Sequence, residues 1–275
     1  KGGLRYDPGG QTNCACLASP LVVAGEARIH VDDADGDPAV CNTLVLAGGV
    51  SGGAALRKSG EGRLAVAGAA CELEGGLVVE DGILQVDADL SRTDVALAAD
   101  GAWLCGTGRV GRVSGAGCVS PGHLCAGRIE AKSLGGELDF AFRFASSGEA
   151  VEGNDLVSLS LSDAPFFSVL GASSRVSVYF DRLPPEDGYA LGGFATASGS
   201  DFLRFVALAD WRFYVPDDAG PVAFEGRRYA PCGVPLTLET VTSGGGRRLK
   251  IARPAHGYAR WRASQFTRAE QCDPA

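Results

Sequence analysis

The chain has 275 residues, of which 45% are hydrophobic, and it contains 40 glycines and no methionine. This composition excludes a disordered chain, and the glycine content disfavours long helices because each interior glycine costs about 0.5–1 kcal/mol relative to alanine. The 25 basic and 33 acidic residues give a net charge of −8, which argues against nucleic acid as a partner. The sequence has no run of about 18 or more apolar residues, so no membrane-spanning helix is predicted.

Residues 1–20 are glycine-rich and polar, and Cys14-Ala15-Cys16-Leu17 is typical of a short strand that needs a partner. An open strand edge accepts further strands, so we predict that this segment pairs with another copy of the chain. Self-association, including growth into a filament, is therefore the expected partner interaction. A frayed terminus of a monomer is the alternative.

An acidic turn follows the alternating stretch of residues 28–31. Asp33, Asp35 and Asp37 alternate along it, beside Gly36, as in a loop that binds calcium through carboxylate oxygens. The glycine precedes the third aspartate and Leu44 stands where an EF-hand has its closing glutamate. We keep calcium as a candidate ligand and a solvated acidic turn as the alternative.

Short strands with period-two alternation, bounded by Gly, Asp, Ser or Pro, dominate the rest of the chain. They are predicted at residues 64–67, 77–79, 83–86, 138–144, 156–161 and 175–180. Between residues 44 and 130 a glycine followed by a short aliphatic strand recurs. Such strands bury their apolar side only by stacking coil on coil, so residues 44–130 are expected to be strand and turn with parallel pairing between coils.

The stretch from Gly48 to Phe140 resembles the autotransporter-associated β-strand repeat proteins. The similarity lies in Gly75–Val86, Leu97–Leu104, Gly106–Val113 and Gly117–Gly122, and continues in the phrases at residues 138–140 and 154–157. The resemblance implies a right-handed parallel β-helix, also called a β-solenoid, of the passenger type. It specifies an architecture and no particular activity.

After about residue 145 phenylalanine becomes common and prolines mark longer loops. We therefore divide the chain into a β-solenoid with its N-terminal segment at 1–145 and a β-rich C-terminal portion at 146–275. The second portion either continues the solenoid or folds as a β-sandwich, and a distinct portion that covers the open end of the solenoid is favoured.

The nine cysteines favour disulfides in an oxidising compartment over reduced thiols. The candidates are Cys14 or Cys16, the pair Cys118 and Cys125, and the pair Cys232 and Cys272. The count is odd, so at least one thiol is free or joined to another chain. This pattern predicts an extracellular or cell-surface protein, and Lys1 is interpreted as the start of a processed segment, which is compatible with export.

Several motifs have features of catalytic sites. Residues 106–111 match a dinucleotide fingerprint but lack a following helix, so solenoid corners explain them, and Ser51 lacks the strand–turn–helix context of a nucleophile. His30 and the acidic cluster of Glu149, Glu152 and Asp155 could serve polysaccharide cleavage on a groove. Exposed aromatic residues could stack on sugar rings, although core packing is favoured; these are Trp211, Tyr214, Tyr229, Tyr258 and Trp261.

The sequence thus predicts an all-β extracellular protein with a structural or adhesive role at the cell surface, without enzymatic activity and without a cofactor other than calcium. The alternative is a cell-surface β-helix that binds or cleaves polysaccharide, in which case a glycan is the partner. A groove with converging carboxylates and a basic residue distinguishes this alternative from a purely structural unit.

Overall fold

The computed structural model describes residues 2–9, 13–33, 41–69, 71–122, 124–148, 152–159, 174–196, 200–243 and 246–254. In these ranges the fold is nearly all β, with mainly parallel sheets and the single helix α2 (Ser200–Leu208). Sheet A contains, in spatial order, β1 (Gly2–Tyr6), β4 (Ala27–Val31), β7 (Leu56–Ser59), β10 (Leu77–Val79), β13 (Val95–Leu97), β15 (Arg109–Gly115), β17 (Arg128–Gly136), β19 (Leu156–Leu159), β21 (Tyr189–Thr196), β26 (Gly246–Ala252) and β25 (Thr237–Ser243), and β12 (Asp89–Leu90) pairs with β15.

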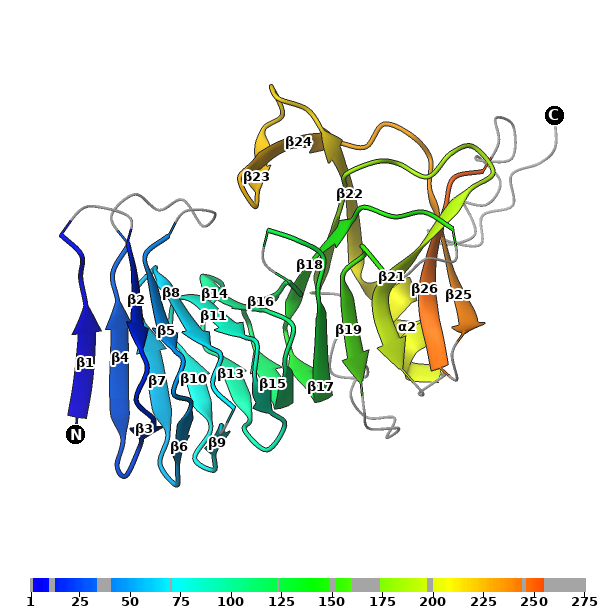
Figure 1. Ribbon diagram of the computed structural model, residues 1–275. Coiled ribbons are helices and arrows are strands. Elements are labelled where there is room, and N and C mark those ends of the chain that lie inside the picture. Colours follow the sequence, from blue (N-terminus) through cyan, green and yellow to red (C-terminus); the bar gives the residue numbers. More distant parts are fainter. Residues whose placement is uncertain are drawn as a thin grey trace, which may run out of the picture.

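Two further sheets accompany sheet A along the molecule (Figure 1). Sheet B contains β2 (Cys14–Leu17), β5 (Thr43–Leu46), β8 (Arg63–Val66), β11 (Gly82–Val86), β14 (Ala102–Cys105), β16 (Cys118–Val119), β18 (Asp139–Phe144), β20 (Arg175–Phe180), β22 (Asp210–Pro216), β24 (Arg227–Pro231) and β23 (Val222–Phe224). Sheet C contains β3 (Leu21–Val22), β6 (Val50–Gly52) and β9 (Glu72–Leu73). The chain therefore visits the sheets in turn, and each coil adds one strand to sheet A and one to sheet B.

The core consists of apolar side chains stacked in register between coils. In sheet B one inward row runs through Ala15, Leu44, Leu64, Leu84, Leu104, Val119, Phe140, Val176 and Trp211. Residues of this row from Leu44 to Val176 are 5% exposed or less. Because alternate residues point to opposite faces, one apolar row per strand suffices to close the interior. The strand and parallel pairing predicted for residues 44–130 is confirmed in the described part of that range.

Glycine is required where a strand of one coil turns the corner against the coil below. Gly115, at the end of β15, has a φ of 122°, and a Cβ placed on it would lie 1.9 Å from the carbonyl oxygen of Leu97. Only glycine tolerates this backbone conformation and this close approach. The recurrent Gly–aliphatic unit of the sequence thus reflects the corners of stacked coils.

In the C-terminal part larger aromatic side chains fill the interior. Phe194 on β21 packs edge-on against Phe140, with ring centroids 4.9 Å apart, and against Phe205 of α2 at 5.3 Å. β21 ends at Thr196, and the short helix α2 then buries Phe202, Phe205 and Val206, which share one helical face.

The parallel pairing continues through residue 145, where the two portions of the chain were expected to meet. Strands β17, β19 and β21 are parallel neighbours in sheet A, as are β18, β20 and β22 in sheet B. Among the strands that the structure describes, pairing becomes antiparallel only at β23, β24, β25 and β26.

The described residues contain no helix with the length and apolarity needed to cross a membrane.

The N-terminal segment was predicted to pair with another copy of the chain, and this is wrong for its strands. β1 pairs with β4 and β2 pairs with β5, both in parallel, so they form the first coil of the same core. Leu4 faces Ile29 in the register, and Ala15 faces Leu44. The apolar alternation of these strands was sufficient to join their own core.

Candidate binding cleft

The outward face of sheet B carries one row of side chains that changes character along the molecule. The row runs through Thr43, Arg63, Ile83, Trp103, Cys118, Asp139, Arg175 and Asp210. Its middle part is aromatic and apolar, and its C-terminal part is charged. A second row on the same face runs through Arg143, Tyr179 and Tyr214. These two rows form the floor of the candidate site.

The hairpin of β23 and β24 folds back over this floor, as seen above β16 and β18 in Figure 1. Phe224, at the end of β23, stacks on Tyr179 with ring centroids 4.0 Å apart and an interplanar angle of 12°. Tyr179 also stacks on Tyr214 at 4.9 Å, and the ring of Tyr229 meets Tyr179 edge-on at 5.0 Å. The buried aromatic cluster fixes the hairpin as a rigid roof.

The tip of the hairpin is held by polar contacts. Glu225 has a φ of 46°, and its Oε1 accepts a hydrogen bond from the backbone N–H of Leu124 at 3.0 Å. Its Oε2 lies 3.7 Å from Nη1 of Arg143. Arg143 also donates to Asp181 at 2.8 Å, and Arg227 of β24 donates to the same carboxylate. Burial raises the pKa of Glu225 above its usual value.

Between floor and roof lie two adjoining cavities that share Trp103, Ala223 and Phe224. The larger, of about 450 Å³, has a size typical of ligand sites. The smaller, of about 100 Å³, is mostly apolar and ends at Glu225. We call the two together the hairpin cleft, and half-buried Trp103 stands between its two parts.

The larger cavity has a polar rim on the corner where sheet A turns into sheet B. Asp100 precedes β14 and Glu137 precedes β18, and both are exposed. Within the described part of the chain, neither carboxylate has an ion-pair or hydrogen-bond partner. Asp139 differs, since its Oδ1 accepts the backbone N–H of Arg175 at 2.7 Å and its Oδ2 lies 3.6 Å from the Arg175 guanidinium. The larger cavity thus offers three carboxylates, one guanidinium and an aromatic surface.

The predicted calcium loop is only partly within the described residues. Asp33 is described, and its Oδ1 accepts the backbone N–H of Asn42 at 3.2 Å. Asp35 and Asp37 lie outside the described residues. Elsewhere in the described ranges no group of three or more His, Cys, Asp or Glu side chains is arranged to hold a metal ion.

The predicted carboxylate cluster does not form a catalytic pair in the part of the chain described. Asp155 is fully buried, and its two carboxylate oxygens accept the backbone N–H groups of Gly127 at 2.8 Å and Arg143 at 2.6 Å. Burial raises the pKa of Asp155 well above its usual range. Glu152 is exposed, whereas Glu149 lies outside the described residues. Asp155 therefore holds two backbone segments together.

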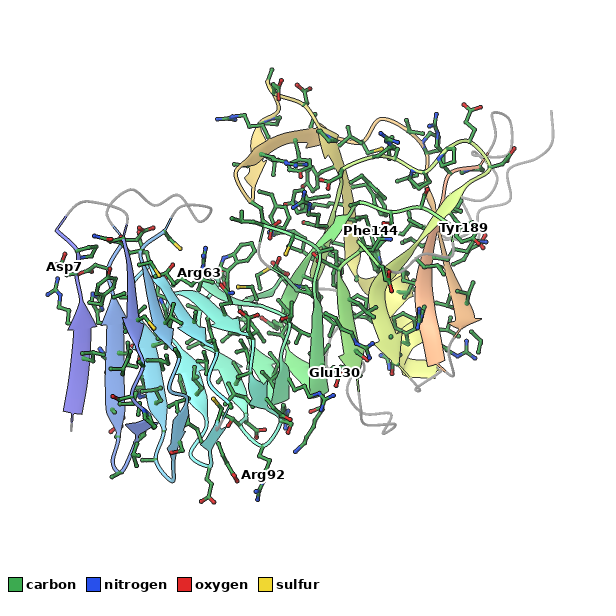
Figure 2. The ribbon with its side chains drawn as sticks, in the orientation of Figure 1. Asp7, Arg63, Arg92, Glu130, Phe144 and Tyr189 are labelled. Carbon is green, nitrogen blue, oxygen red and sulfur yellow. The ribbon has the colours of Figure 1, made fainter. Side chains whose placement is uncertain are left out.

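His30, the other catalytic candidate, sits on the outer face of sheet A. Its Nε2 lies 2.7 Å from Oδ1 of Asp32, and its Nδ1 lies 3.1 Å from Oγ of Ser59. Asp32 also binds the Arg5 guanidinium, which lowers the pKa of its carboxyl. Ion pairs of this kind recur on the outer surface, as between Arg92 and Glu72 and between Glu130 and Arg109; Figure 2 labels Arg92 and Glu130. They belong to a solvated charged face.

All eight described cysteines are free thiols in the structure. The disulfide predicted between Cys118 and Cys125 is absent: Cys118 points outward from sheet B into the buried aromatic cluster of the cleft, while Cys125 is exposed in a loop. Cys14 and Cys16 are both exposed and unbridged. Cys232 is unbridged, and Cys272, its predicted partner, lies outside the described residues.

The thiols are expected to differ sharply in reactivity. Burial raises the pKa of Cys105 and Cys118, so neither forms the reactive thiolate readily, whereas Cys14, Cys16 and Cys125 are exposed. Iodoacetamide at pH 8 should alkylate the exposed three first and the buried two only in denaturant, as read by peptide mass spectrometry. Alkylation of Cys118 as fast as Cys16 in the native protein would contradict this, and equal rates in denaturant are the control.

The predicted sugar-stacking aromatics take other roles. Trp211 packs against the core, Tyr229 is buried, and Tyr214 stacks on Tyr179. Tyr258 and Trp261 lie outside the described residues. The aromatic residues that do line the cleft are Trp103, Phe140, Tyr179 and Phe224, and none of them was among the predicted sites. For Trp103 the signal was the strand alternation of residues 102–105, which places an aromatic side chain on the outward face.

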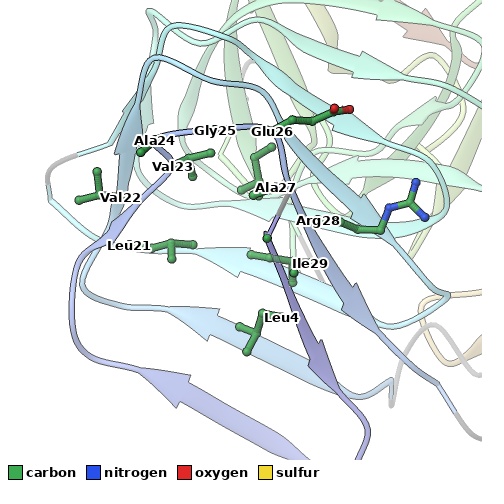
Figure 3. Close-up of a pocket in the computed structure, with 13 residues that line it drawn as sticks. Leu4, Leu21, Val22, Val23, Ala24, Gly25, Glu26, Ala27, Arg28 and Ile29 are labelled. Atoms are coloured by element: carbon green, nitrogen blue, oxygen red, sulfur yellow. The ribbon is translucent and has the colours of Figure 1, made fainter.

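A second exposed surface lies at the N-terminal end of the stacked coils, the N-terminal pole (Figure 3). Within the described residues no strand pairs with the outer edges of β1, β2 and β3. A cavity of about 390 Å³ opens there beside Leu21 and Ile29. Leu4 is 42% exposed and Val22 is 67% exposed. Open strand edges accept further strands, so self-association through this pole stays a prediction.

If copies of the chain associate through this pole, Leu4→Lys combined with Val22→Lys should abolish the association, because two charges would be buried against an apolar surface. Sedimentation velocity over a concentration series measures this. Leu203→Lys, on an exposed position of α2, is the matched control and should leave association unchanged. Unaltered association in the double variant would remove the pole as the interface.

The remaining motifs occupy structural positions. Ser51 lies in β6, between β3 and β9 of sheet C, and no helix follows it. Residues 106–111 lead into β15, again without a helix, as expected for corners between coils.

No protein-family model matches the chain, and no curated protein matches its sequence.

Proposed function

We propose that the protein is an adhesive and structural component of the cell surface, a right-handed parallel β-solenoid that carries a preformed ligand cleft on its side. The observation that supports this most is the hairpin cleft, where an aromatic wall and a polar rim converge between sheet B and the β23–β24 hairpin. A cavity that is already formed loses little conformational freedom when a ligand binds. The stacked coils supply the rigid body on which the cleft is held.

The right-handed sense is proposed from the connections between parallel strands. Each strand of sheet A returns to the same sheet one coil later as a parallel neighbour. Crossovers between parallel strands of one sheet are right-handed in about 98% of cases. The repeat phrases of residues 48–140 also resemble passenger proteins of this hand, which supports the same choice.

An extracellular or cell-surface location is proposed from the same resemblance. The eight free thiols give it no support, because disulfides were the feature expected of an oxidising compartment. Labelling of intact cells with a membrane-impermeant biotin reagent tests the location directly. Recovery of the protein only from lysed cells would overturn it.

The adhesive role is tested with beads coated with the purified protein and presented to a panel of bacterial, animal and plant cell surfaces. Adhesion to at least one surface is expected, and Trp103→Ala should reduce it strongly because Trp103 separates the two parts of the cleft. Leu203→Ala, far from the cleft on α2, is the control. Adhesion to no surface, or adhesion indifferent to Trp103, would overturn the proposal.

A further inference from the structure

We infer that the hairpin cleft binds an oligosaccharide chain, and that it prefers a chain bearing amino groups to a neutral chain and a neutral chain to one bearing carboxylates. This inference rests on the proposed adhesive function and names the ligand class of the same site. It follows from three features of the cleft: the aromatic surface, the unsatisfied hydrogen-bonding groups and the balance of charge.

The aromatic surface suits the face of a sugar ring. A pyranose presents C–H groups on its faces and hydroxyl groups around its edge, so its face gains by burial against an apolar ring while its edge needs polar partners. Trp103 is half-buried, and it lines both parts of the cleft. Phe224 and Tyr179 are locked by stacking and cannot turn away. The cleft therefore provides one accessible indole beside a rigid aromatic wall.

The polar groups lie at the edge of the same surface. Asp100, Glu137 and Asp139 line the larger cavity together with Arg175 and the hydroxyl-bearing Ser177. Carboxylates accept hydrogen bonds from sugar hydroxyls, and the two oxygens of one carboxylate often accept from two neighbouring hydroxyl groups. A guanidinium donates hydrogen bonds to hydroxyl or ring oxygens. Since Asp100 and Glu137 have no partner among the described residues, a ligand can use both without breaking an existing bond.

The charge balance selects among sugars. Three carboxylates and one guanidinium give the larger cavity a net charge of −2 at neutral pH, and the Arg175 guanidinium is already close to Asp139. The whole chain is acidic as well, at −8. A uronic acid chain is therefore repelled, whereas an amino sugar gains charge-assisted hydrogen bonds at the rim.

The test is isothermal titration calorimetry of the intact chain with three hexamers: β-1,4-linked glucosamine, its N-acetylated counterpart, and galacturonic acid. The glucosamine hexamer should bind at least tenfold more tightly than the galacturonic acid hexamer, with the N-acetylated hexamer between them. Trp103→Ala should weaken binding of the first two at least tenfold, and Trp103→Phe should restore most of it. Glu137→Gln should reduce the preference for glucosamine over its N-acetylated counterpart several-fold, while Glu74→Gln, an exposed acid outside the cleft, should not.

Each other outcome contradicts the inference. If a hexalysine peptide binds as tightly as the glucosamine hexamer and with the same loss in Glu137→Gln, the cleft recognises charge alone. If galacturonic acid binds most tightly, the charge argument is wrong. If none of the three hexamers binds while bead adhesion still depends on Trp103, the ligand class is wrong and the adhesive function stands. If adhesion is also absent, both fail.

Discussion

Asp155→Asn is expected to lower the free energy of unfolding by about 2–6 kcal/mol, although it is isosteric. Both carboxylate oxygens of Asp155 accept backbone N–H groups, those of Gly127 and Arg143, in a fully buried site. An asparagine has a single acceptor oxygen, so its amide NH₂ would face one of these N–H groups. One backbone donor and the new side-chain donor would then be buried without partners, at about 1–3 kcal/mol each.

The measurement is urea unfolding followed by circular dichroism. Asp94→Asn is the matched control. Asp94 Oδ1 accepts the N–H of Arg112 at 2.8 Å, the distance at which Asp155 Oδ1 accepts the N–H of Gly127, but on an exposed surface where water can replace the lost hydrogen bond. Equal losses in the two variants would contradict the role of burial. Since Arg143 also contacts Glu225 at the hairpin tip, Asp155→Asn should weaken ligand binding in the cleft as well.

Lys58→Met is expected to remove a pH dependence of stability between about pH 8 and 10.5. Lys58 is fully buried, and its Nζ donates to the carbonyl oxygens of Gly60 and Asp81. Burial lowers the pKa of Lys58 from 10.5 to about 8. Between these two values the unfolded chain binds a proton that the folded chain does not, so the free energy of unfolding rises with pH across this window.

The difference between 10.5 and about 8, at about 1.4 kcal/mol per pH unit, corresponds to a rise of about 3 kcal/mol. It should be present in the wild type and absent in Lys58→Met. Urea unfolding at pH 7.5, 9 and 10.5 measures this rise. Subtracting the free energy of unfolding of Lys58→Met from that of the wild type at each pH removes the contribution of thiol and tyrosine titration. Lys132→Met, at an exposed position of sheet A, is the control and should follow the wild type. Parallel curves for wild type and Lys58→Met would contradict the buried lysine as the cause.

The sequence by itself determined the stacked strands of the first coils. Thr43, Arg63, Ile83 and Trp103 occupy one outward row and are separated by 20 residues each. Short aliphatic strands at that spacing, ended by glycines, bury an apolar face only when the coils stack, so composition and periodicity led to the parallel architecture. Even the strands of the N-terminal segment obeyed this local pattern.

Tertiary structure alone decided the site. Beyond Trp103 the same row continues to Cys118, Asp139 and Arg175 with separations of 15, 21 and 36 residues, so the sequence spacing does not reveal that these side chains are neighbours. The roof of the cleft depends on contacts of still longer range, such as Glu225 with Leu124, 101 residues apart. Such contacts depend on the length of each coil and on where the hairpin folds back, which no local alternation encodes. Cysteine counting failed for the same reason: outward-facing Cys118 became buried beneath the hairpin, while Cys125 stayed exposed in a loop.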